Sequence, residues 1–331
     1  MSALIDIRKK KLEQWASFYL GCMVKGTEAS SDASFRRYFR FQNGAQNLVA
    51  MDAPPESEDC RPFVAVAKML AKAGVNVPDI LQEDIGRGFL LLSDLGMETW
   101  LEILSEKNAD GMFADAIGVL LKMQKIKRGA LLEYDRPLLQ RELDLFRDWY
   151  LNTHLSLDHD NSLDAALDTV FALLIENALA QGQVFVHRDY MPRNLMDSHP
   201  NPGVLDFQDA VWGPISYDPI CLFKDAFISW PESKVQGWLK DYWTRALDAG
   251  LPVPPSFEQF QFDCDLMSAH RHLKVIGIFS RICHRDGKPR YLEDVPRFFA
   301  YLDTVAKRQP KLAILKSLLA DLRARSDEVP R

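Results

Sequence analysis

Polar residues between positions 187 and 209 have the types and the spacing that phosphoryl transfer requires. The run His187-Arg188-Asp189 is followed five residues later by Asn194, and Asp206 comes twelve residues after Asn194. Phosphoryl transfer needs one carboxylate that orients the attacking hydroxyl and accepts its proton. It also needs an amide oxygen and a second carboxylate that hold Mg²⁺ against the phosphates. This short part of the chain supplies one residue of each kind.

Two short apolar stretches are expected to position these residues. Val184–Val186 leads into His187 and Gly203–Leu205 leads into Asp206, so each stretch is predicted to be a strand. We expect the two strands to lie side by side and to end at the same edge, where ligands collect. The alternative is an ordinary region that contains acidic residues by chance. The agreement of order, spacing and flanking strands argues against chance.

The first 95 residues are predicted to be rich in strands. Residues 35–41 alternate in polarity and place Arg36, Tyr38 and Arg40 on one face of a strand. Asn43-Gly44 is a strong signal for a hairpin turn. The other elements predicted in this part are helices over residues 4–21 and 56–73, closed by Gly21 and Gly74, and strands over residues 47–51, 75–84 and 88–92.

The character of the chain changes after Leu95-Gly96. Amphipathic helices are predicted over residues 98–125, 137–155, 162–182 and most of 218–325. We therefore expect an α+β protein with a small β-rich lobe (residues 1–95), a hinge at 92–97 and a large helical lobe (residues 98–331). The large lobe is expected to carry the catalytic loop at 187–194 and the metal-binding segment at 206–209.

The composition is that of an average globular protein. The chain has 331 residues, of which 47% are hydrophobic and 26% are charged, and its net charge is −6. This balance argues against a disordered chain, a fibre and a general binder of nucleic acid or anionic membranes. The five cysteines lack a CxxC spacing and are expected to be reduced. We find no apolar signal core or membrane-spanning run, so we expect a cytoplasmic protein, and we predict no protein partner.

The pattern HxDxxxxN followed by DFx resembles the signature of the protein-kinase-like superfamily. Here it reads HRDYMPRN and then LDFQD. Gln208 replaces the glycine of protein kinases, and the run DAVWGPISYDP that follows is similar to the aminoglycoside phosphotransferase and choline kinase branch. The segment FLLLSDLG at 89–96 resembles the hinge of that branch. The resemblance spans nearly the whole chain. It implies a two-lobed, protein-kinase-like α+β fold of the aminoglycoside phosphotransferase type, with ATP between the lobes.

Three longer blocks look like the bacterial amino-sugar kinases of cell-wall recycling. They are SDASFRRYFR with AMDAPPE, FVHRDYMPRNLM with PGVLDFQDAVWGPISYD, and CLFKDAFISWPE. Members of that family phosphorylate the anomeric hydroxyl of N-acetylmuramate and N-acetylglucosamine. The resemblance therefore implies ATP and Mg²⁺ as cofactors, an amino sugar as the acceptor, sugar 1-phosphates as products, and a role in peptidoglycan recycling.

The resemblance also implies roles for single residues. Asp189 matches the catalytic base of the superfamily, and Asn194 and Asp206 match its Mg²⁺ ligands. His187 and Asp218 match structural residues that support the catalytic loop.

The nucleotide-binding part departs from the pattern of protein kinases. The turn Ser30–Ser34 contains no glycine, so it is either a phosphate cradle built from hydroxyl and N–H groups or an ordinary turn. The residues expected to bind the nucleotide are Ser31 and Ser34 in this turn, Arg36 and Arg40 in the strand, and Ser93, Asp94 and Leu95 in the hinge, whose backbone should bind adenine.

The lysine of the third strand is missing, because Met51 and Asp52 stand in its place. The phosphates still need a cation, and we expect Arg36 or Arg40 to supply it. The other arginine would then pair with a carboxylate of the following helix, such as Glu58. The alternative is that both arginines are solvated charges on an edge strand.

The acceptor site is expected to combine basic and aromatic residues. Met191 stands where protein kinases carry a second lysine, and Arg193 suits an anionic acceptor or the phosphoryl group in flight. The alternative for Arg193 is a salt bridge within the loop. Arg271 shares a helix face with Lys274, and this face is either a basic stripe along the cleft or a solvated or internally paired surface. The acceptor-site candidates besides Arg193 are Trp212, Lys224, Asp225 and Arg271.

Two other functions stay open on the sequence alone. The protein could phosphorylate another small hydroxyl compound, such as choline, homoserine or an aminoglycoside, and a panel of acceptors would separate these. It could also bind nucleotide as a pseudokinase scaffold. The missing lysine and glycine-rich loop favour the scaffold, whereas the intact Asp189, Asn194 and Asp206 oppose it.

Overall fold

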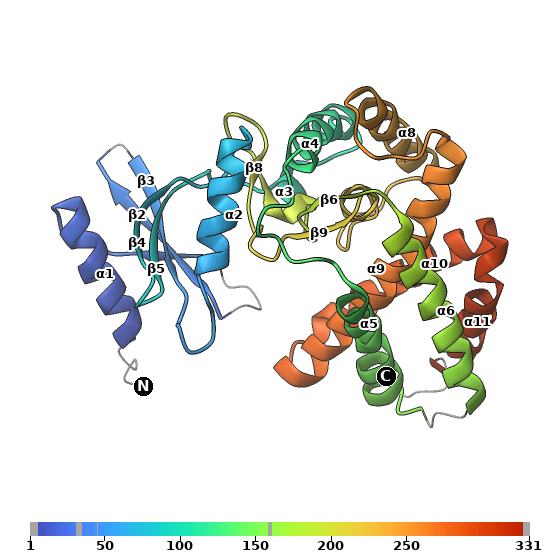
Figure 1. The fold of residues 1–331 in the computed structure, drawn as a ribbon. Coiled ribbons are helices and arrows are strands. Elements are labelled where there is room, and N and C mark those ends of the chain that lie inside the picture. Colours follow the sequence, from blue (N-terminus) through green and yellow to red (C-terminus); the bar gives the residue numbers. More distant parts are fainter. Residues whose placement is uncertain (1–5, 31–34, 45, 158–160, 327–331) are drawn as a thin grey trace. The chain divides into compact units, whose positions relative to one another are not determined.

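The computed structural model describes residues 6–30, 35–44, 46–157 and 161–326 and divides into two compact units (Figure 1). The first unit is formed by Met1–Ile103 together with Arg193–Asp209, and the second by Leu104–Pro192 together with Ala210–Arg331. The sequence analysis assigned residues 193–209 to the helical lobe, but they pack with the first unit. The reason is local, because Val204 N donates a 2.7 Å hydrogen bond to Asn76 O of that unit.

The first unit contains an antiparallel five-stranded sheet with the order β1-β2-β3-β5-β4. Its strands are β1 (Thr27–Ser30), β2 (Arg37–Asn43), β3 (Gln46–Asp52), β4 (Ile80–Asp84) and β5 (Phe89–Ser93). A separate hairpin is formed by β7 (Leu195–Met196) and β8 (Gly203–Val204). The helices of this unit are α1 (Ile7–Leu20), α2 (Arg61–Lys72) and the short α3 (Trp100–Ile103).

Helices α1 and α2 lie on opposite faces of this sheet (Figure 1). The apolar side chains of α1 pack on Phe39 and Phe41 in a continuous buried core. The Asp6 side chain caps α1 by accepting a hydrogen bond from Lys9 N at 3.0 Å. Gly21 ends the helix with a φ of 67°, which a residue without a side chain adopts freely.

The strands and helices predicted for this unit are present, but several ends differ. Strand β1 is not predicted from the sequence, because its residues are polar and it is held by pairing with β2 rather than by a hydrophobic face. Helix α2 begins at Arg61 instead of residue 56, because the Pro54 carbonyl accepts two 2.8 Å hydrogen bonds in a preceding turn. Strand β4 begins only after Pro78, which has no N–H to donate to a ladder.

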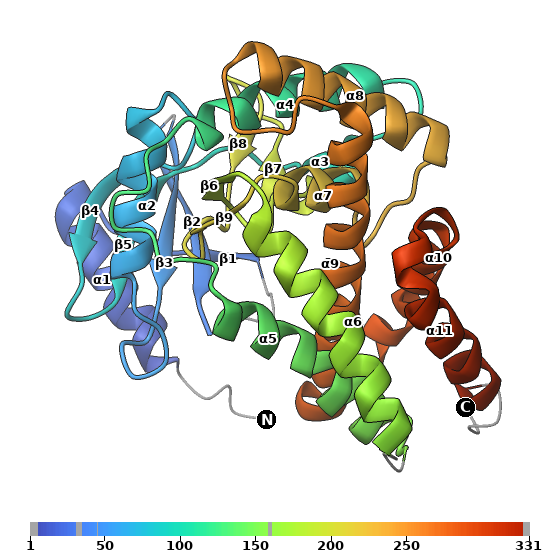
Figure 2. The same cartoon turned by 45° about the vertical axis from the view of Figure 1, so that its right-hand side comes forward.

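The second unit is mainly helical, and its other helices pack around the long helix α9 (Figure 2). Strands β6 (Gln183–Val186) and β9 (Val211–Pro214) pair in a two-stranded antiparallel sheet. The helices of this unit are α4 (Ala109–Gln124), α5 (Arg136–Leu145), a π-helical segment (Phe146–His154), α6 (Asn161–Ala180), α7 (Tyr217–Phe223), α8 (Glu232–Asp248), α9 (Phe257–Asp286), α10 (Val295–Arg308) and α11 (Ala313–Ser326), with short 3-10 turns at Pro289–Asp294 and Pro310–Leu312.

Helix α9 lies at the centre of the second unit because neighbouring helices can approach it closely. Ser256 caps its start by accepting a hydrogen bond from Gln259 N at 3.2 Å. At Gly277 an added Cβ would lie 2.3 Å from the Leu145 carbonyl carbon. Only glycine therefore allows the end of α5 and the π-helical segment to pack directly against α9.

Two of the predicted long helices are interrupted. The helix predicted over residues 98–125 is split into α3 and α4, because the Asn108 side chain accepts hydrogen bonds from Ser105 N at 2.7 Å and Ser105 Oγ at 3.0 Å. The helix predicted over residues 137–155 changes from α to π geometry at Phe146. Strand β9 is not predicted from the sequence.

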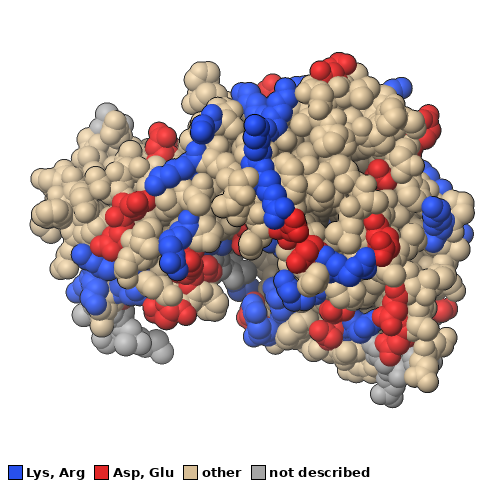
Figure 3. Space-filling view, viewed as in Figure 1, with Lys and Arg blue, Asp and Glu red and all other residues tan. Residues whose placement is uncertain are grey.

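Charge and cysteine chemistry match the sequence analysis. Basic and acidic side chains are intermixed on the face that Figure 3 shows, in keeping with the small net charge. All five cysteines are free thiols, and Cys60, Cys221 and Cys264 are buried. None of the helices in the described residues is long and apolar enough to span a membrane.

Candidate active site

The catalytic loop begins where β6 ends, inside the second unit. Val184–Val186 of β6 are buried and pair with β9, with Val186 opposite Val211. His187, the next residue, is completely buried, whereas Asp189 is partly exposed. The buried strand therefore fixes the start of the loop, and the carboxylate follows two residues later.

Asp218, at the start of α7, holds the backbone of this loop. Its Oδ2 accepts a hydrogen bond from His187 N at 2.8 Å, and its Oδ1 accepts one from Arg188 N at 3.0 Å. The His187 ring accepts a further bond from Asp189 N at 3.3 Å. Burial raises the pKa of Asp218 to about 7, although the two N–H donors act in the opposite direction. The ionised form, which can accept both bonds, therefore predominates above pH 7.

Asn194 and Asp206 flank the β7–β8 hairpin in the first unit. Leu205 N donates a 2.9 Å hydrogen bond to Asn194 O, so the two ends of the hairpin are adjacent. Asp206 is exposed and has a φ of 62°, a left-handed conformation that is uncommon outside glycine and often found at functional sites. Gln208 Nε2 donates to Asp206 Oδ1 at 2.9 Å and to Asp209 Oδ2 at 3.2 Å. Gln208, which replaces the glycine found in protein kinases, therefore orients the carboxylate of Asp206.

The two apolar strands are not neighbours in one sheet, and this prediction is wrong. Strand β6 pairs with β9, and β8 pairs with β7. The reason is that each strand finds a partner within its own unit, and for β8 that partner is the strand that comes just before it in the chain. The predicted base and the predicted metal ligands thus lie in two separate structural elements.

Asn194 and Asp206 offer the donors that Mg²⁺ prefers. An amide oxygen and a carboxylate are hard ligands, and nucleotide-bound Mg²⁺ takes its other ligands from phosphates and water. In the described residues no three His, Cys, Asp or Glu side chains come together as a metal site. A Mg²⁺ that needs one carboxylate and one amide from the chain does not require such a group, so these residues fit the metal.

In the hinge, the Asp94 side chain is bound by Arg40. Arg40 Nε donates to Asp94 Oδ2 at 2.6 Å, and Arg40 Nη2 donates to Gly96 O at 2.7 Å. The other two predicted hinge residues are Ser93 and Leu95. Ser93 N donates to Asp79 O at 2.9 Å, and the Leu95 side chain is partly exposed. Arg40 of β2 is therefore paired internally with the residue that follows β5, and it is not a solvated edge charge.

Arg36 lies on the face of the sheet where the lysine is missing. The register places Tyr38 opposite Met51. Arg36 directly precedes β2, and extending the alternation of the strand by one residue puts it on the same side as both. Its Nε is 4.0 Å from Glu58 Oε2, which precedes α2. The predicted division of labour, with one arginine at the phosphates and the other near a helix carboxylate, is not found in that form: the arginine near Glu58 is Arg36, whereas Arg40 is paired with Asp94. The predicted phosphate-cradle residues Ser31 and Ser34 lie outside the described residues.

Asp52 faces the opposite side of the sheet from Met51. Its side chain is completely buried and is bound by Arg8 Nε at 2.9 Å and by Arg37 Nη2 at 2.5 Å. This carboxylate is therefore neutralised within the α1 side of the unit and does not compete for a cation on the other face.

Three predicted acceptor residues are almost completely buried in the second unit. The exposed fractions of Lys224, Asp225 and Arg271 are 1%, 0% and 2%. Asp225 Oδ1 accepts two backbone hydrogen bonds of 2.6 and 2.9 Å, whereas its Oδ2 has no hydrogen-bond partner among the described residues. Among the described residues, Arg271 makes only long contacts, from Nη1 to Lys224 O at 3.4 Å and from Nη2 to Met191 Sδ at 3.8 Å. Arg271 is thus a buried cation beside the catalytic loop.

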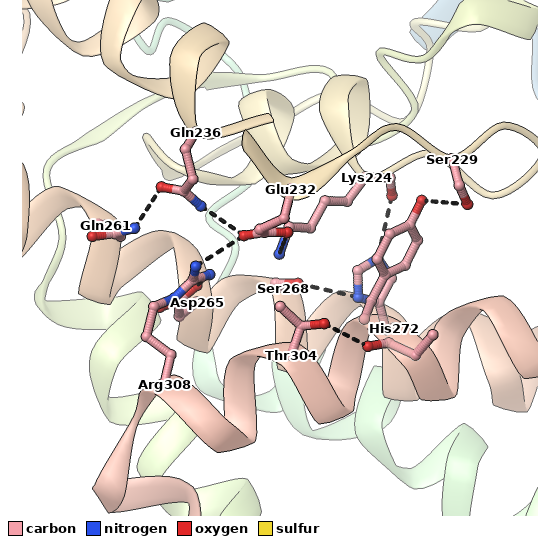
Figure 4. A network of polar contacts seen from close by, with 12 residues as sticks. Lys224, Ser229, Glu232, Gln236, Gln261, Asp265, Ser268, His272, Thr304 and Arg308 are labelled. Atoms are coloured by element: carbon pink, nitrogen blue, oxygen red, sulfur yellow. Dashed lines mark hydrogen bonds and ion pairs between the residues drawn. The ribbon is translucent and has the colours of Figure 1, made fainter. Parts of the chain in front are cut away.

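Lys224 belongs to a polar network that joins α7, α8, α9 and α10 (Figure 4). Its Nζ lies 3.6 Å from Glu232 Oε2. Glu232 also accepts a 2.9 Å bond from Arg308, which binds Asp265 at 2.5 and 2.8 Å. His272 Nε2 is 3.2 Å from Lys224 O. The Lys224 ammonium group thus has an ion pair at 3.6 Å but no hydrogen-bond partner among the described residues.

The remaining acceptor candidates lie in different units. Arg193 is partly exposed in the first unit, at the end of the catalytic loop. Trp212 lies on β9 of the second unit, where its side chain is half-buried and its N donates to Leu132 O at 2.8 Å.

The sequence analysis missed Glu142, which lies at the centre of a second polar cluster. This residue is 4% exposed, and Lys274 Nζ lies 2.9 Å from its Oε1. The face of α9 that carries Lys274 is therefore buried and internally paired rather than solvated. A signal was present in the sequence, because Leu139, Leu143 and Phe146 form an apolar stripe on which Glu142 also falls.

Comparison with known proteins places this arrangement in a family. The model of the phosphotransferase enzyme family matches residues 25–260. An N-acetylmuramate/N-acetylglucosamine kinase of Pseudomonas putida is 56% identical, and the match covers 96% of this chain and 98% of that protein. A protein of the same name from Pseudomonas aeruginosa is 60% identical, with 89% of this chain and 87% of that protein covered.

Solved structures share the fold at low sequence identity. An ADP-bound aminoglycoside phosphotransferase has a TM-score of 0.62 at 15% identity, with 91% of this chain and 99% of that chain covered. A choline kinase from Streptococcus pneumoniae has a TM-score of 0.63 at 13% identity, with 89% and 98% covered. These similarities confirm the predicted protein-kinase-like α+β fold of the aminoglycoside phosphotransferase type. On the family match and the identity of its relatives, the chain is a phosphotransferase and belongs to the phosphotransferase enzyme family.

Proposed function

We propose that this enzyme transfers the γ-phosphoryl group of ATP to the anomeric hydroxyl of N-acetylmuramate and N-acetylglucosamine, with sugar 1-phosphates as products. The observation that carries the proposal is the 56–60% identity to kinases named for these two sugars. Nucleotide-bound structures with the same fold support ATP as the donor. The residues that the chemistry needs, Asp189, Asn194 and Asp206, are all present.

Asp189 is the proposed base. It orients the acceptor hydroxyl and takes its proton, and Asp218 and His187 hold the loop that carries it. When bound to Asn194 and Asp206, Mg²⁺ would neutralise charge on the phosphates. The presence of Asp189, Asn194 and Asp206 argues against a pseudokinase, because a scaffold that only binds nucleotide does not need a base together with metal ligands. For the hinge we keep the proposal that the backbone of residues 93–95 binds adenine.

Arg36 is the proposed cation for the nucleotide phosphates. It shares a face with Met51 and lies near Glu58, the arrangement in which other kinases hold a lysine and a glutamate. Arg40, in contrast, is bound to Asp94 and to the backbone of the hinge. Its contacts suit a structural role at the hinge.

Replacing these two arginines separates their roles. Arg36→Ala should weaken ATP binding about 10–100-fold, because a charge-assisted hydrogen bond to phosphate contributes about 1.5–3 kcal/mol. Its affinity for adenosine, which has no phosphate, should be unchanged. Arg40→Ala should weaken ATP and adenosine by the same factor, since it alters the hinge. Calorimetric titration of both ligands measures these ratios, and unchanged ATP affinity in Arg36→Ala would remove Arg36 from the site.

For the acceptor we propose Arg193, Trp212, Asp225 and Arg271. Arg271 takes part in no ion pair among the described residues, and a buried guanidinium without a carboxylate partner favours an anionic ligand. N-acetylmuramate carries a lactyl carboxylate, and the transferred phosphoryl group is also anionic. Polycationic aminoglycosides suit this cation poorly. Lys224 is left out of the proposed set because its charge is paired with Glu232 at 3.6 Å inside the unit.

The test of the proposed function is a panel of acceptors. Initial rates of ADP formation are measured with N-acetylmuramate, N-acetylglucosamine, choline, homoserine and an aminoglycoside at equal concentrations. The two amino sugars should give the largest kcat/KM. A higher kcat/KM for any other acceptor would replace the sugar assignment and leave the family assignment intact. Because the donor is ATP, we extend the proposal to a reaction in the cytoplasm that serves peptidoglycan recycling.

A further inference from the structure

A single buried carboxylate, Glu142 of α5, lies among groups from three other parts of the second unit. Its Oε1 contacts Arg188 Nη2 of the catalytic loop and lies 2.9 Å from Lys274 Nζ of α9. Its Oε2 accepts a hydrogen bond from the Tyr134 hydroxyl. Lys274 Nζ also donates to Tyr217 Oη of α7 at 3.0 Å. The carboxylate thus connects the catalytic loop to the helical framework.

The charges in this cluster depend on Glu142. Burial opposes ionisation of its carboxyl, but Lys274 and Arg188 outweigh this and lower the pKa of Glu142 to about 2. The same contact raises the pKa values of Arg188 and Lys274, against the effect of burial. Removing the negative charge would leave one buried and one partly buried cation in contact with a neutral group, which is strongly unfavourable.

Arg188 is the residue through which this cluster meets the active site. It has a φ of 77°, a left-handed conformation that is unfavourable for a residue with a side chain. Such a conformation persists only when the surroundings hold it. Here Asp218 accepts the Arg188 N–H at 3.0 Å, Glu142 binds its guanidinium, and the Tyr134 ring lies 5.7 Å beneath it. Arg188 is peptide-bonded to Asp189, so its backbone torsions determine where the Asp189 carboxylate points.

We propose that Glu142 is a positioning residue for phosphoryl transfer. Through the Arg188 side chain it holds the catalytic loop in the conformation that presents Asp189 to the acceptor. This inference rests on the proposed role of Asp189 as the base, and it assigns Glu142 no contact with either substrate.

The direct test is Glu142→Gln, which keeps the size of the side chain and removes its charge. We expect kcat to fall about 10–100-fold, because a displacement of about 1 Å in a catalytic group costs up to about 100-fold. The KM values for ATP and for the acceptor should stay within about twofold, since the binding residues are not altered. A fall in affinity without a change in kcat would contradict a positioning role.

Asp265→Asn is the matched control. Asp265 is also a buried carboxylate, 2% exposed, and it binds Arg308 at 2.5 and 2.8 Å and Gln309 at 2.7 Å. It lies in the network of Figure 4, and among the described residues its hydrogen bonds go to Arg308 and Gln309 and not to the catalytic loop. Asp265→Asn should lower the free energy of unfolding as Glu142→Gln does, but leave kcat per folded molecule unchanged.

Hydrogen exchange gives a second measurement that needs no substrate. In the peptide that spans residues 184–191, Glu142→Gln should speed amide exchange several-fold, because the hold on Arg188 is weakened. Asp265→Asn should leave that peptide unchanged. The measurement also keeps the two proposals separate. A wild-type protein that phosphorylates neither amino sugar would contradict the proposed function. The exchange rates of residues 184–191 would still test the role of Glu142, because they are measured without substrate.

Two further variants complete the test. In the Arg188→Met background, Glu142→Gln should reduce kcat by less than twofold more, because its effect is transmitted through Arg188. If the losses of kcat from the two substitutions multiply in the double variant, the proposal is overturned.

If Glu142→Gln fails to fold, Tyr134→Phe is the alternative variant, because it removes only one hydrogen bond to the carboxylate. It should speed exchange in residues 184–191 and lower kcat a few-fold, and wild-type values of both would overturn the proposal.

Discussion

Asp189→Asn is expected to reduce kcat by about 10²–10⁴-fold, the usual contribution of a general base. The asparagine fills the same space but cannot accept the proton of the attacking hydroxyl. The hydrogen bonds from His187 N and Arg188 N to Asp218 do not involve the Asp189 side chain, so the loop should keep its conformation. Binding of ATP and the free energy of unfolding should therefore stay close to the wild-type values.

The control for this prediction is Asp168→Asn on α6. Asp168 is an exposed aspartate of the same unit that pairs with Arg147 at 2.5 Å, and its replacement should leave kcat unchanged. Single-turnover measurements with saturating ATP isolate the transfer step. If Asp189→Asn keeps a tenth or more of the wild-type rate in that experiment, Asp189 is not the base.

Asp206→Asn is the second substitution with a large expected effect. Asp206 is the only carboxylate among the proposed Mg²⁺ ligands of the chain, and its loss should lower kcat by about 10²–10³-fold, as for other groups that stabilise charge in transfer. The Mg²⁺ concentration that gives half-maximal activity should rise at least tenfold. Gln208 should still hold residue 206 through a hydrogen bond, so the hairpin should remain folded.

The matched control is Asp197→Asn, an exposed aspartate beside the same hairpin whose N donates to Glu98 O at 3.0 Å. Titration of each variant with Mn²⁺ in the presence of ADP, followed by electron paramagnetic resonance, measures metal binding without turnover. Weaker Mn²⁺ binding in Asp206→Asn and wild-type binding in Asp197→Asn are expected. Equal binding in both would show that Asp206 does not hold the metal.

Local chemistry made much of the fold predictable from the sequence. Strand alternation in residues 35–41 and the Asn43-Gly44 turn are found as β2 and the start of its hairpin, and Gly21 ends α1 where predicted. These signals depend on neighbouring residues only. Strand β1 shows the limit, because its polar residues carry no pattern and it forms by pairing with β2.

The candidate site was predictable where a motif fixes both residue type and spacing. Asp189, Asn194 and Asp206 could be named in this way, and their roles stay predictions. The structure shows that Arg40 binds Asp94, and no spacing rule connects residues 54 positions apart. The same holds for Glu142 and Arg188, which are separated by 46 positions and meet through the packing of α5 against the catalytic loop.

Partners of buried charges were the hardest part to predict. Arg271 and Lys274 share one face of α9, and the sequence could not tell a solvated face from a buried one. Lys274 is neutralised by Glu142, whereas the contacts of Arg271 in the described part of the chain are long ones to a carbonyl oxygen and to sulfur. The difference arises from which helices pack on α9, and this is a property of the whole unit.

The central claim is that this enzyme makes amino-sugar 1-phosphates with Asp189 as the base. The most direct test is phosphorus-31 NMR of the wild-type protein with ATP, Mg²⁺ and N-acetylmuramate, beside Asp189→Asn under identical conditions. The account predicts a new signal whose phosphorus couples to the anomeric proton in the wild-type sample, and no such signal with Asp189→Asn. A sugar-phosphate signal at another hydroxyl, none from either amino sugar, or equal signals from both proteins would contradict it.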